Sequence, residues 1–213
     1  MRLGRKYDIQ QLYSEALTRL EFEFPSTLEG YDRSANSWTL ILSSGVDVGY
    51  ALVSAVVNLG RENDILHILP LAFYIICNWH TAKELIEAME QSEGPALREL
   101  SVFDRGAVIK GWHSLVERQA TETLKWLVQE DIFTTICTAY SCAKNRRDHL
   151  HRYWFPQVSC SALEAWQSGW DEDYCKACAS KSKELHDSGR RKIWEELPLF
   201  FGLPRWEELT KKT

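Results

Sequence analysis

The sequence lacks the features of a secreted or membrane-spanning chain. Met1 is followed by Arg2, Arg5 and Lys6, with no apolar stretch and no small-residue cleavage site behind them, so no secretory signal is predicted. The best candidate for a membrane span is the stretch 65–82, but its His, Pro and Asn residues leave too few consecutive apolar positions to cross about 30 Å of hydrocarbon. We therefore expect an intracellular protein, in the cytoplasm or nucleus, and interpret this stretch as a buried helix.

Nucleotide-binding and catalytic signatures are also missing. The glycine residues form neither a G-x-G-x-x-G fingerprint nor a P-loop, so nucleotide binding has no support. No grouping of nucleophile, base and acid marks a catalytic site, and we expect no enzyme activity and no small-molecule substrate. The net charge of −5 lacks the basic excess that neutralises nucleic-acid phosphates, which disfavours a general nucleic-acid binder.

The composition is that of a folded protein. Apolar residues make up 45% of the 213 residues and charged residues 26%, and the chain has nine Trp, eight Tyr and eight Phe, far more aromatic residues than disordered chains contain. The charge is uneven along the chain. Residues 1–136 hold 12 Lys and Arg against 19 Asp and Glu, whereas residues 137–213 hold 13 against 11. The two parts are therefore expected to meet different surroundings.

Helical periodicity dominates the first two-thirds of the chain. Apolar residues recur at spacings of three and four and predict helices over 9–24, 46–59, 65–78, 81–90 and 104–127. Asp8 is the expected cap of the first helix, with a buried face running from Ile9 through Leu12 and Leu20 to Phe24, and Pro25 ends it. The segment 25–45, with its apolar island Trp38–Leu42, is expected to be a loop or docked linker, and Gln91–Pro95 a turn.

The last third differs in composition. Residues 134–153 and 161–185 read as helices that carry most of the cysteines and basic runs, and 190–197 and 205–211 read as short terminal helices around an apolar segment that should dock on the body. The sequence therefore predicts an all-α protein, an irregular multi-helix bundle. We expect a helical bundle over 1–133 and a Cys/Trp-rich helical subdomain over 134–213, with the alternative that both pack as one unit.

Four of the six cysteines have the spacing of a metal site. Cys175 and Cys178 form a C-x-x-C pair, and Cys137 and Cys142 form a second pair upstream, so four thiolates are available for one structural zinc ion. In a continuous helix, Cys137 and Cys142 would lie about 140° apart around the axis. They can share a metal only if the helix begins, ends or bends between them.

Two other interpretations of these cysteines stay open. Buried helical cysteines are common because Cys behaves as a small hydrophobic residue, and a redox role of the C-x-x-C pair is the third reading, although no βαβ pattern surrounds it. His149, His151 and His186 are further candidate ligands, because imidazole binds zinc as readily as thiolate does.

Basic residues in the last third suggest one alternative partner. Lys144, Arg146, Arg147 and Arg152 precede Tyr153 and Trp154, a combination of charge and aromatic rings that single-stranded nucleic acid can use. Solvated helix surface explains the same pattern. A zinc-stabilised, nucleic-acid-associated module is therefore the alternative to a protein-binding one.

Several stretches resemble one protein family. The segment Met1–Ile9, followed by an amphipathic helix that ends in Glu23-Phe-Pro25, is similar to the segment directly after the BTB/POZ fold in the basidiomycete BTB-domain proteins. The similar stretches farther along the chain are Val57–Glu62, Ile68–Pro70, Trp166 and Trp170 with Tyr174–Cys178, Ile193–Pro198 and Phe201–Trp206. The resemblance extends over essentially the whole chain, and none of its motifs is catalytic.

This resemblance implies a helical protein-interaction region. In BTB proteins such regions support dimerisation and, in some, engagement of a cullin-type ubiquitin ligase scaffold. The sequence departs from the family by starting where the BTB fold would have ended, so the surfaces of that fold cannot be assigned to any residue, and we expect either a fragment of a longer BTB protein or a helical part that acts alone. The expected function is non-enzymatic protein binding to an unidentified partner.

Overall fold

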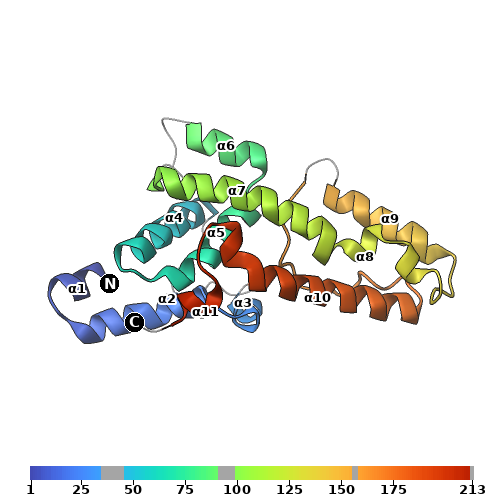
Figure 1. Cartoon of the computed structure of the whole chain (residues 1–213), viewed down its shortest axis with the longest axis horizontal. Coiled ribbons are helices and arrows are strands. Elements are labelled where there is room, and N and C mark those ends of the chain that lie inside the picture. Colours follow the sequence, from blue (N-terminus) through green and yellow to red (C-terminus); the bar gives the residue numbers. More distant parts are fainter. Residues whose placement is uncertain (35–45, 91–98, 155–157, 212–213) are drawn as a thin grey trace.

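The computed structural model describes residues 1–34, 46–90, 99–154 and 158–211, and these segments contain helices and no strand. The helices form an elongated molecule (Figure 1). In chain order they are α1 (Arg2–Lys6), α2 (Gln10–Glu23), α3 (Leu28–Ser34), α4 (Val46–Glu62), η1 (Leu66–Ile68), α5 (Leu69–Trp79), α6 (Ala82–Glu90), α7 (Val102–Arg118), η3 (Gln119–Thr123), α8 (Lys125–Val128), η4 (Asp131–Phe133), α9 (Ser141–Trp154), α10 (Lys176–Phe200) and α11 (Trp206–Leu209). The prediction of an all-α multi-helix fold is confirmed.

Helix α5 is the centre of the main core. Its residues Leu69–Cys77 are all buried, and it packs against α4, α7 and α10. The uniform burial explains the dense apolar sequence of 65–78, because a helix surrounded by other helices needs no polar face. None of the described helices combines the length and apolarity that a membrane crossing requires. Pro70 lies in the first turn of α5, where its missing N–H costs no hydrogen bond.

The N-terminal helices differ in part from the prediction. Helix α2 begins after Ile9, and Asp8 provides no cap because it lies in the left-handed region, with φ of 53°. Leu20 and Phe24 are buried as expected, but Ile9 and Leu12 are 47% and 41% exposed. The expected buried face is therefore wrong for the first half of α2, which extends beyond the core at one end of the molecule (Figure 1).

Part of the predicted loop 25–45 forms a helix. Helix α3 occupies Leu28–Ser34, where a loop or linker over 25–45 was expected. The rest of that loop, with the island Trp38–Leu42, lies outside the described residues, as does the expected turn Gln91–Pro95.

The predicted helix 104–127 is interrupted. Helix α7 starts at Val102, capped by Ser101, whose Oγ accepts a hydrogen bond from the Asp104 amide at 3.1 Å. One turn of π-helix, η3, follows it and leads into the short α8. The wider π turn inserts an extra residue and turns Gln119 and Thr123 into the interior, where both are fully buried.

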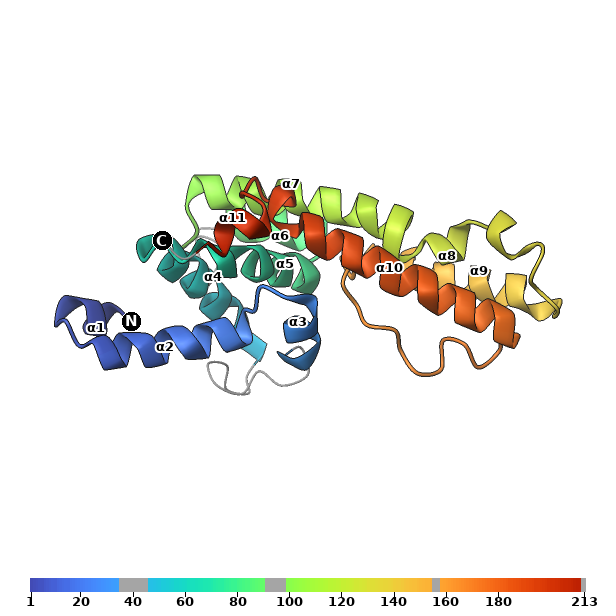
Figure 2. The same cartoon turned by 60° about the horizontal axis from the view of Figure 1, so that its bottom comes forward.

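The last third contains the largest departures. Residues 134–140 are not helical, and α9 begins only at Ser141, where a helix over 134–153 was predicted. Residues 158–174 form an irregular connector, although a helix was predicted over 161–185. Helix α10 runs unbroken from Lys176 through the predicted short helix 190–197 to Phe200. In Figure 2 the connector is the orange loop below α10. The predicted docking of the apolar terminal segment is confirmed by buried Phe201 and Leu203.

The buried apolar residues form two clusters. The larger, around α4, α5 and α7, also takes in Cys160, Leu163 and the second half of α10. The smaller one, which we call the distal cluster, combines residues of α8, η4 and the first turns of α9 and α10. Its buried members are Leu124, Trp126, Leu127, Phe133, Cys142, Tyr174 and Cys178. Helix α10 therefore joins the two clusters along its length.

Candidate metal centre

The structure brings the four cysteines of the predicted site together. Cys137 lies in the turn before α9, Cys142 in the first turn of α9, Cys175 directly before α10 and Cys178 in its first turn. Their Sγ atoms all lie within 4.8 Å of one another. Zn–S bonds of 2.3 Å in a tetrahedron would place the sulfurs about 3.8 Å apart, so the cluster can hold one metal ion with little movement.

The local chain explains how the upstream pair converges. After η4, the Cys137 amide donates to Phe133 O at 2.9 Å and the Cys142 amide to Ala139 O at 3.3 Å, which folds 134–140 into consecutive turns. Because α9 starts at Ser141, Cys137 lies outside the helix and Cys142 inside it. A helix boundary between the two cysteines is the condition that their spacing required.

Hydrogen bonds link the sulfurs to the backbone. The Cys175 amide donates to Cys142 Sγ at 3.2 Å. Hydrogen bonds from the Thr138 amide and then from the Cys178 amide lower the pKa of the Cys175 thiol to about 5. Cys175 is therefore a thiolate at neutral pH even without a cation, and the N-terminal ends of α9 and α10 add positive potential beside it.

Cys142 and Cys178, the two cysteines of the site that lie within helices, are buried. Burial raises the pKa of Cys142 and of Cys178, because it disfavours the charged thiolate. A bound cation reverses this effect, since it stabilises the anions directly. None of the six cysteines forms a disulfide, and Cys77 and Cys160 are buried in the main core.

The three histidines proposed as substitute ligands lie outside the metal-ligand group. The ring of His149 contacts the Tyr174 hydroxyl through Nδ1 at 3.0 Å, and His186 Nε2 donates to Glu164 O at 2.8 Å. His151 lies exposed on α9. Among the described residues, the group of potential ligands comprises the four cysteines alone.

An aromatic cluster that the sequence did not predict supports the sulfur site. Trp126 is fully buried, and its ring lies 5.1 Å from Trp166, 6.2 Å from Trp170 and 6.2 Å from Tyr174. Tyr174 directly precedes Cys175, so the packing of these rings fixes the start of α10. The residues that meet in this cluster are 40 to 50 positions apart in sequence, and no local pattern signals their contact.

The connector 158–174 is held by buried polar side chains. Gln119 donates from Nε2 to Ser159 O at 3.1 Å and accepts the Ser161 amide at 2.6 Å, and Thr123 Oγ1 donates to Ala162 O at 2.7 Å. Both side chains come from the π turn η3. These contacts replace the backbone hydrogen bonds that a helix would have provided.

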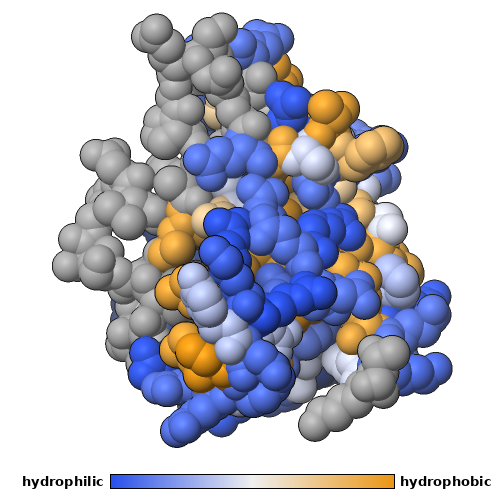
Figure 3. Space-filling view, turned by 90° about the vertical axis from the view of Figure 1, so that its left-hand side faces the viewer, coloured by the Kyte–Doolittle hydropathy of each residue, from blue (hydrophilic) through white to orange (hydrophobic). Residues whose placement is uncertain are grey.

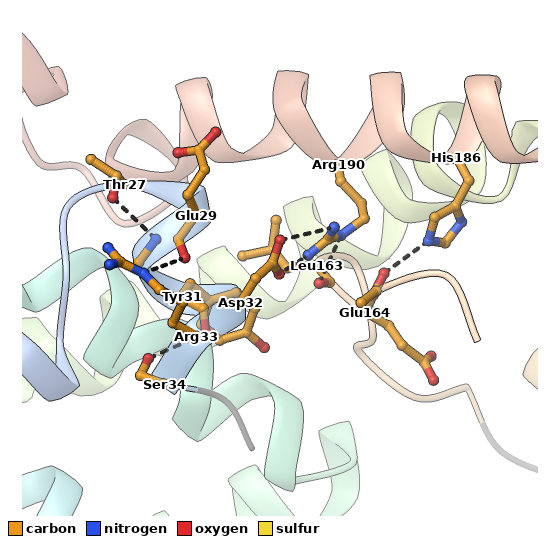
Figure 4. Close-up of polar contacts among 12 residues, drawn as sticks. Thr27, Glu29, Tyr31, Asp32, Arg33, Ser34, Leu163, Glu164, His186 and Arg190 are labelled. Carbon is orange, nitrogen blue, oxygen red and sulfur yellow. Dashed lines mark hydrogen bonds and ion pairs between the residues drawn. The ribbon is translucent and has the colours of Figure 1, made fainter. Parts of the chain in front are cut away.

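Helix α10 completes the support of the connector. Arg190 donates from Nε to Leu163 O at 3.0 Å, and its Nη atoms bind the Asp32 carboxylate of α3 (Figure 4). One helical turn earlier, His186 holds Glu164 O, as the same view shows. The connector therefore leads into Cys175 from a fixed position, although its backbone has no regular secondary structure.

The basic run on α9 is divided between interior and surface. Arg146 is buried, with its guanidinium carbon 4.0 Å from the centre of the Phe133 ring, while Lys144 and Arg147 are exposed. Tyr140, in the loop between the two upstream cysteines, is fully exposed.

Comparison of the chain with protein-family models, with curated proteins and with solved structures gives no match in any of the three. The resemblance to the helical region of BTB-domain proteins therefore stays a prediction. What the structure establishes is an all-α protein with four cysteines placed to hold a metal ion.

Proposed function

We propose that this chain is a non-enzymatic protein-binding module whose distal cluster is closed by one structural zinc ion. The convergence of four Sγ atoms from the starts of two helices is the observation that carries the zinc assignment. A tetrahedral all-sulfur set is typical of zinc or of iron–sulfur centres, and four protein ligands leave zinc no open position for a substrate. Such a site stabilises a fold and performs no reaction.

Metal analysis tests the zinc assignment. Protein purified without chelator should contain about one zinc ion per chain. Cys142→Ser should lose most of it, whereas Cys160→Ser, a buried cysteine outside the cluster, should retain it. Less than half an equivalent of zinc in the unaltered protein would refute the assignment, and iron in its place would change the metal.

The exposed apolar end of the molecule supports the protein-binding part of the proposal. Leu3 of α1, Leu12 of α2, and Tyr7 and Ile9 between these helices are all more than 40% exposed. Leu3 and Leu12 also line a hollow of about 410 Å³ together with Met1, Arg2, Ala55 and Leu59. Figure 3 shows this end of the molecule, where apolar patches border a polar band. Clustered exposed apolar residues are typical of protein contact sites.

The resemblance to the region after the BTB fold points the same way, because that region serves protein contacts. A comparison of proteins retained from cell extract by three immobilised chains tests the proposal. A partner should bind the unaltered chain and Phe103→Lys, an exposed apolar position on α7, but not the double variant Leu3→Lys, Leu12→Lys. Identical retention by all three chains would contradict a binding role for this end.

One observation favours the alternative of nucleic-acid binding. Lys144 and Arg147 are exposed on α9, and neither forms an ion pair with any residue that the structure describes. Phosphate contacts are strongest at low salt. Retention of a single-stranded oligonucleotide at about 50 mM salt, lost in Lys144→Gln, Arg147→Gln, would support this alternative, and no retention would exclude it.

A further inference from the structure

Arg146 of α9 is a buried cation without a charge partner among the described residues. The residue is 3% exposed, and its Nε and Nη1 atoms make no hydrogen bond within the part of the chain that the structure describes. It also forms no ion pair with any described residue. Its guanidinium stacks on Phe133 at 4.0 Å, a contact that leaves the charge uncompensated. A buried charge of this kind is strongly unfavourable unless an anion lies close to it.

The position of Arg146 identifies the anion. It follows Cys142 by four residues on α9, so both side chains project from the same face. Side chains on a helix lean toward its N-terminus, which directs Arg146 toward Cys142. Its guanidinium also stacks on the ring of Phe133, and the carbonyl oxygen of Phe133 accepts a hydrogen bond from the Cys137 amide. Arg146 therefore connects the first turn of α9, which carries Cys142, with Phe133, which precedes Cys137 by four residues.

We infer that Arg146 is the countercharge of a zinc–tetrathiolate centre and stabilises the anionic form of its sulfurs. The inference rests on the proposed zinc site. Four thiolates around Zn²⁺ carry a net charge of −2 in a region where Cys142 and Cys178 are fully buried. The helix N-termini of α9 and α10 supply part of the compensation, and the guanidinium supplies a full positive charge. The negative charge of such a centre would explain why Arg146 is buried although it forms no ion pair with any described residue.

Zinc affinity, measured by competition with a chromophoric chelator, tests the role of Arg146. Arg146→Met keeps the packing on Phe133 and removes the charge, and it should weaken zinc binding by about tenfold to a hundredfold. Arg146→Lys, which keeps the charge, should bind zinc more tightly than Arg146→Met. Arg147→Met, an exposed neighbour on the same helix, should stay within about twofold of the unaltered protein.

The melting temperature with and without zinc separates this role from a merely structural one. Arg146→Met should melt lower than the unaltered protein when zinc is bound, but equally or higher when zinc is removed, because the unpaired buried cation is then gone. A lower melting temperature in both states, or unchanged zinc affinity in a protein that binds zinc, would overturn the inference. Failure of the unaltered protein to bind zinc would instead refute the zinc site, and the role of Arg146 with it.

Discussion

At the scale of single residues, Gly189 permits a close contact between α10 and η3. A Cβ atom at this position of α10 would lie 2.5 Å from the carbonyl carbon and oxygen of Glu122 and 2.6 Å from the Thr123 amide. All three are backbone atoms of η3 and cannot move aside as a side chain would. We therefore expect Gly189→Ala to lower the free energy of unfolding by about 3 kcal/mol, the upper range for overpacked cores.

Gly106 provides the matched control. It lies within α7, and a Cβ there would meet no atom within 4 Å. Gly106→Ala should raise the free energy of unfolding by about 0.5–1 kcal/mol, because alanine restricts the unfolded chain. Urea denaturation of both variants measures the difference, and a similar change in both would show that the contact at Gly189 is not tight.

The buried ring of His186 makes stability depend on pH. Burial lowers its pKa below the ordinary 6.5, so below about pH 6.5 the unfolded chain binds a proton that the folded chain excludes. The free energy of unfolding therefore keeps its full value above about pH 6.5 and decreases as the pH falls below it. His186→Gln should flatten this decrease below about pH 6.5 in urea titrations.

An exposed histidine separates the effect of His186 from other acid-dependent terms. His113→Gln, the same substitution at an exposed position, is the matched control for the change of side chain. The same metal content in all samples cancels the contribution of the thiolates. Parallel pH curves for His186→Gln and the unaltered protein would contradict the predicted role.

At the scale of elements, the pattern of apolar residues predicted the helices of the main core. The expected helices 46–59 and 65–78 correspond to α4 and to η1 with α5, and the four metal-ligand candidates were found from spacing alone. Periodicity could not show that the first half of α2 extends beyond the core, because an apolar stripe looks the same whether or not another element covers it.

The connector shows why the rest of the site was not predicted. Its apolar residues, among them Leu163 and Trp166, recur as they would on a helix, but Gly169 lies in the left-handed region, with φ of 98°. The side chains of Gln119 and Thr123, about 40 residues earlier, form hydrogen bonds with its backbone. Both residues lie in the π turn, which directs them inward. Such long-range pairing of side chain with backbone has no local sequence signal.

Removing one of these contacts should weaken the connection between the elements. Gln119→Leu leaves Ser159 O and the Ser161 amide without their partner and should lower the free energy of unfolding by about 2 kcal/mol. Gln129→Leu, exposed at the end of α8, should change it by less than about 0.5 kcal/mol. Equal effects in urea denaturation would show that η3 does not hold the connector.

At the scale of the whole molecule, stability should be divided between the two apolar clusters. The main core around α5 is large and includes none of the four cysteines of the sulfur site, whereas the distal cluster has seven buried apolar members, two of which are cysteines of that site. A cluster of this size needs additional cross-links, and the proposed metal ion would join the starts of α9 and α10 there. Its removal should therefore affect one end of the molecule.

Hydrogen exchange of the zinc-loaded protein, before and after treatment with a chelator, measures this division. Amides of α9 and of the first turns of α10 should exchange faster after zinc is removed, whereas those of α4 and α5 should keep their protection, because local opening follows the loss of local contacts. Cys160→Ser should behave as the unaltered protein does, since this cysteine belongs to the main core. Faster exchange throughout α4 and α5 would mean that the molecule unfolds as one unit, and unchanged exchange in α9 would mean that the metal contributes nothing to its stability.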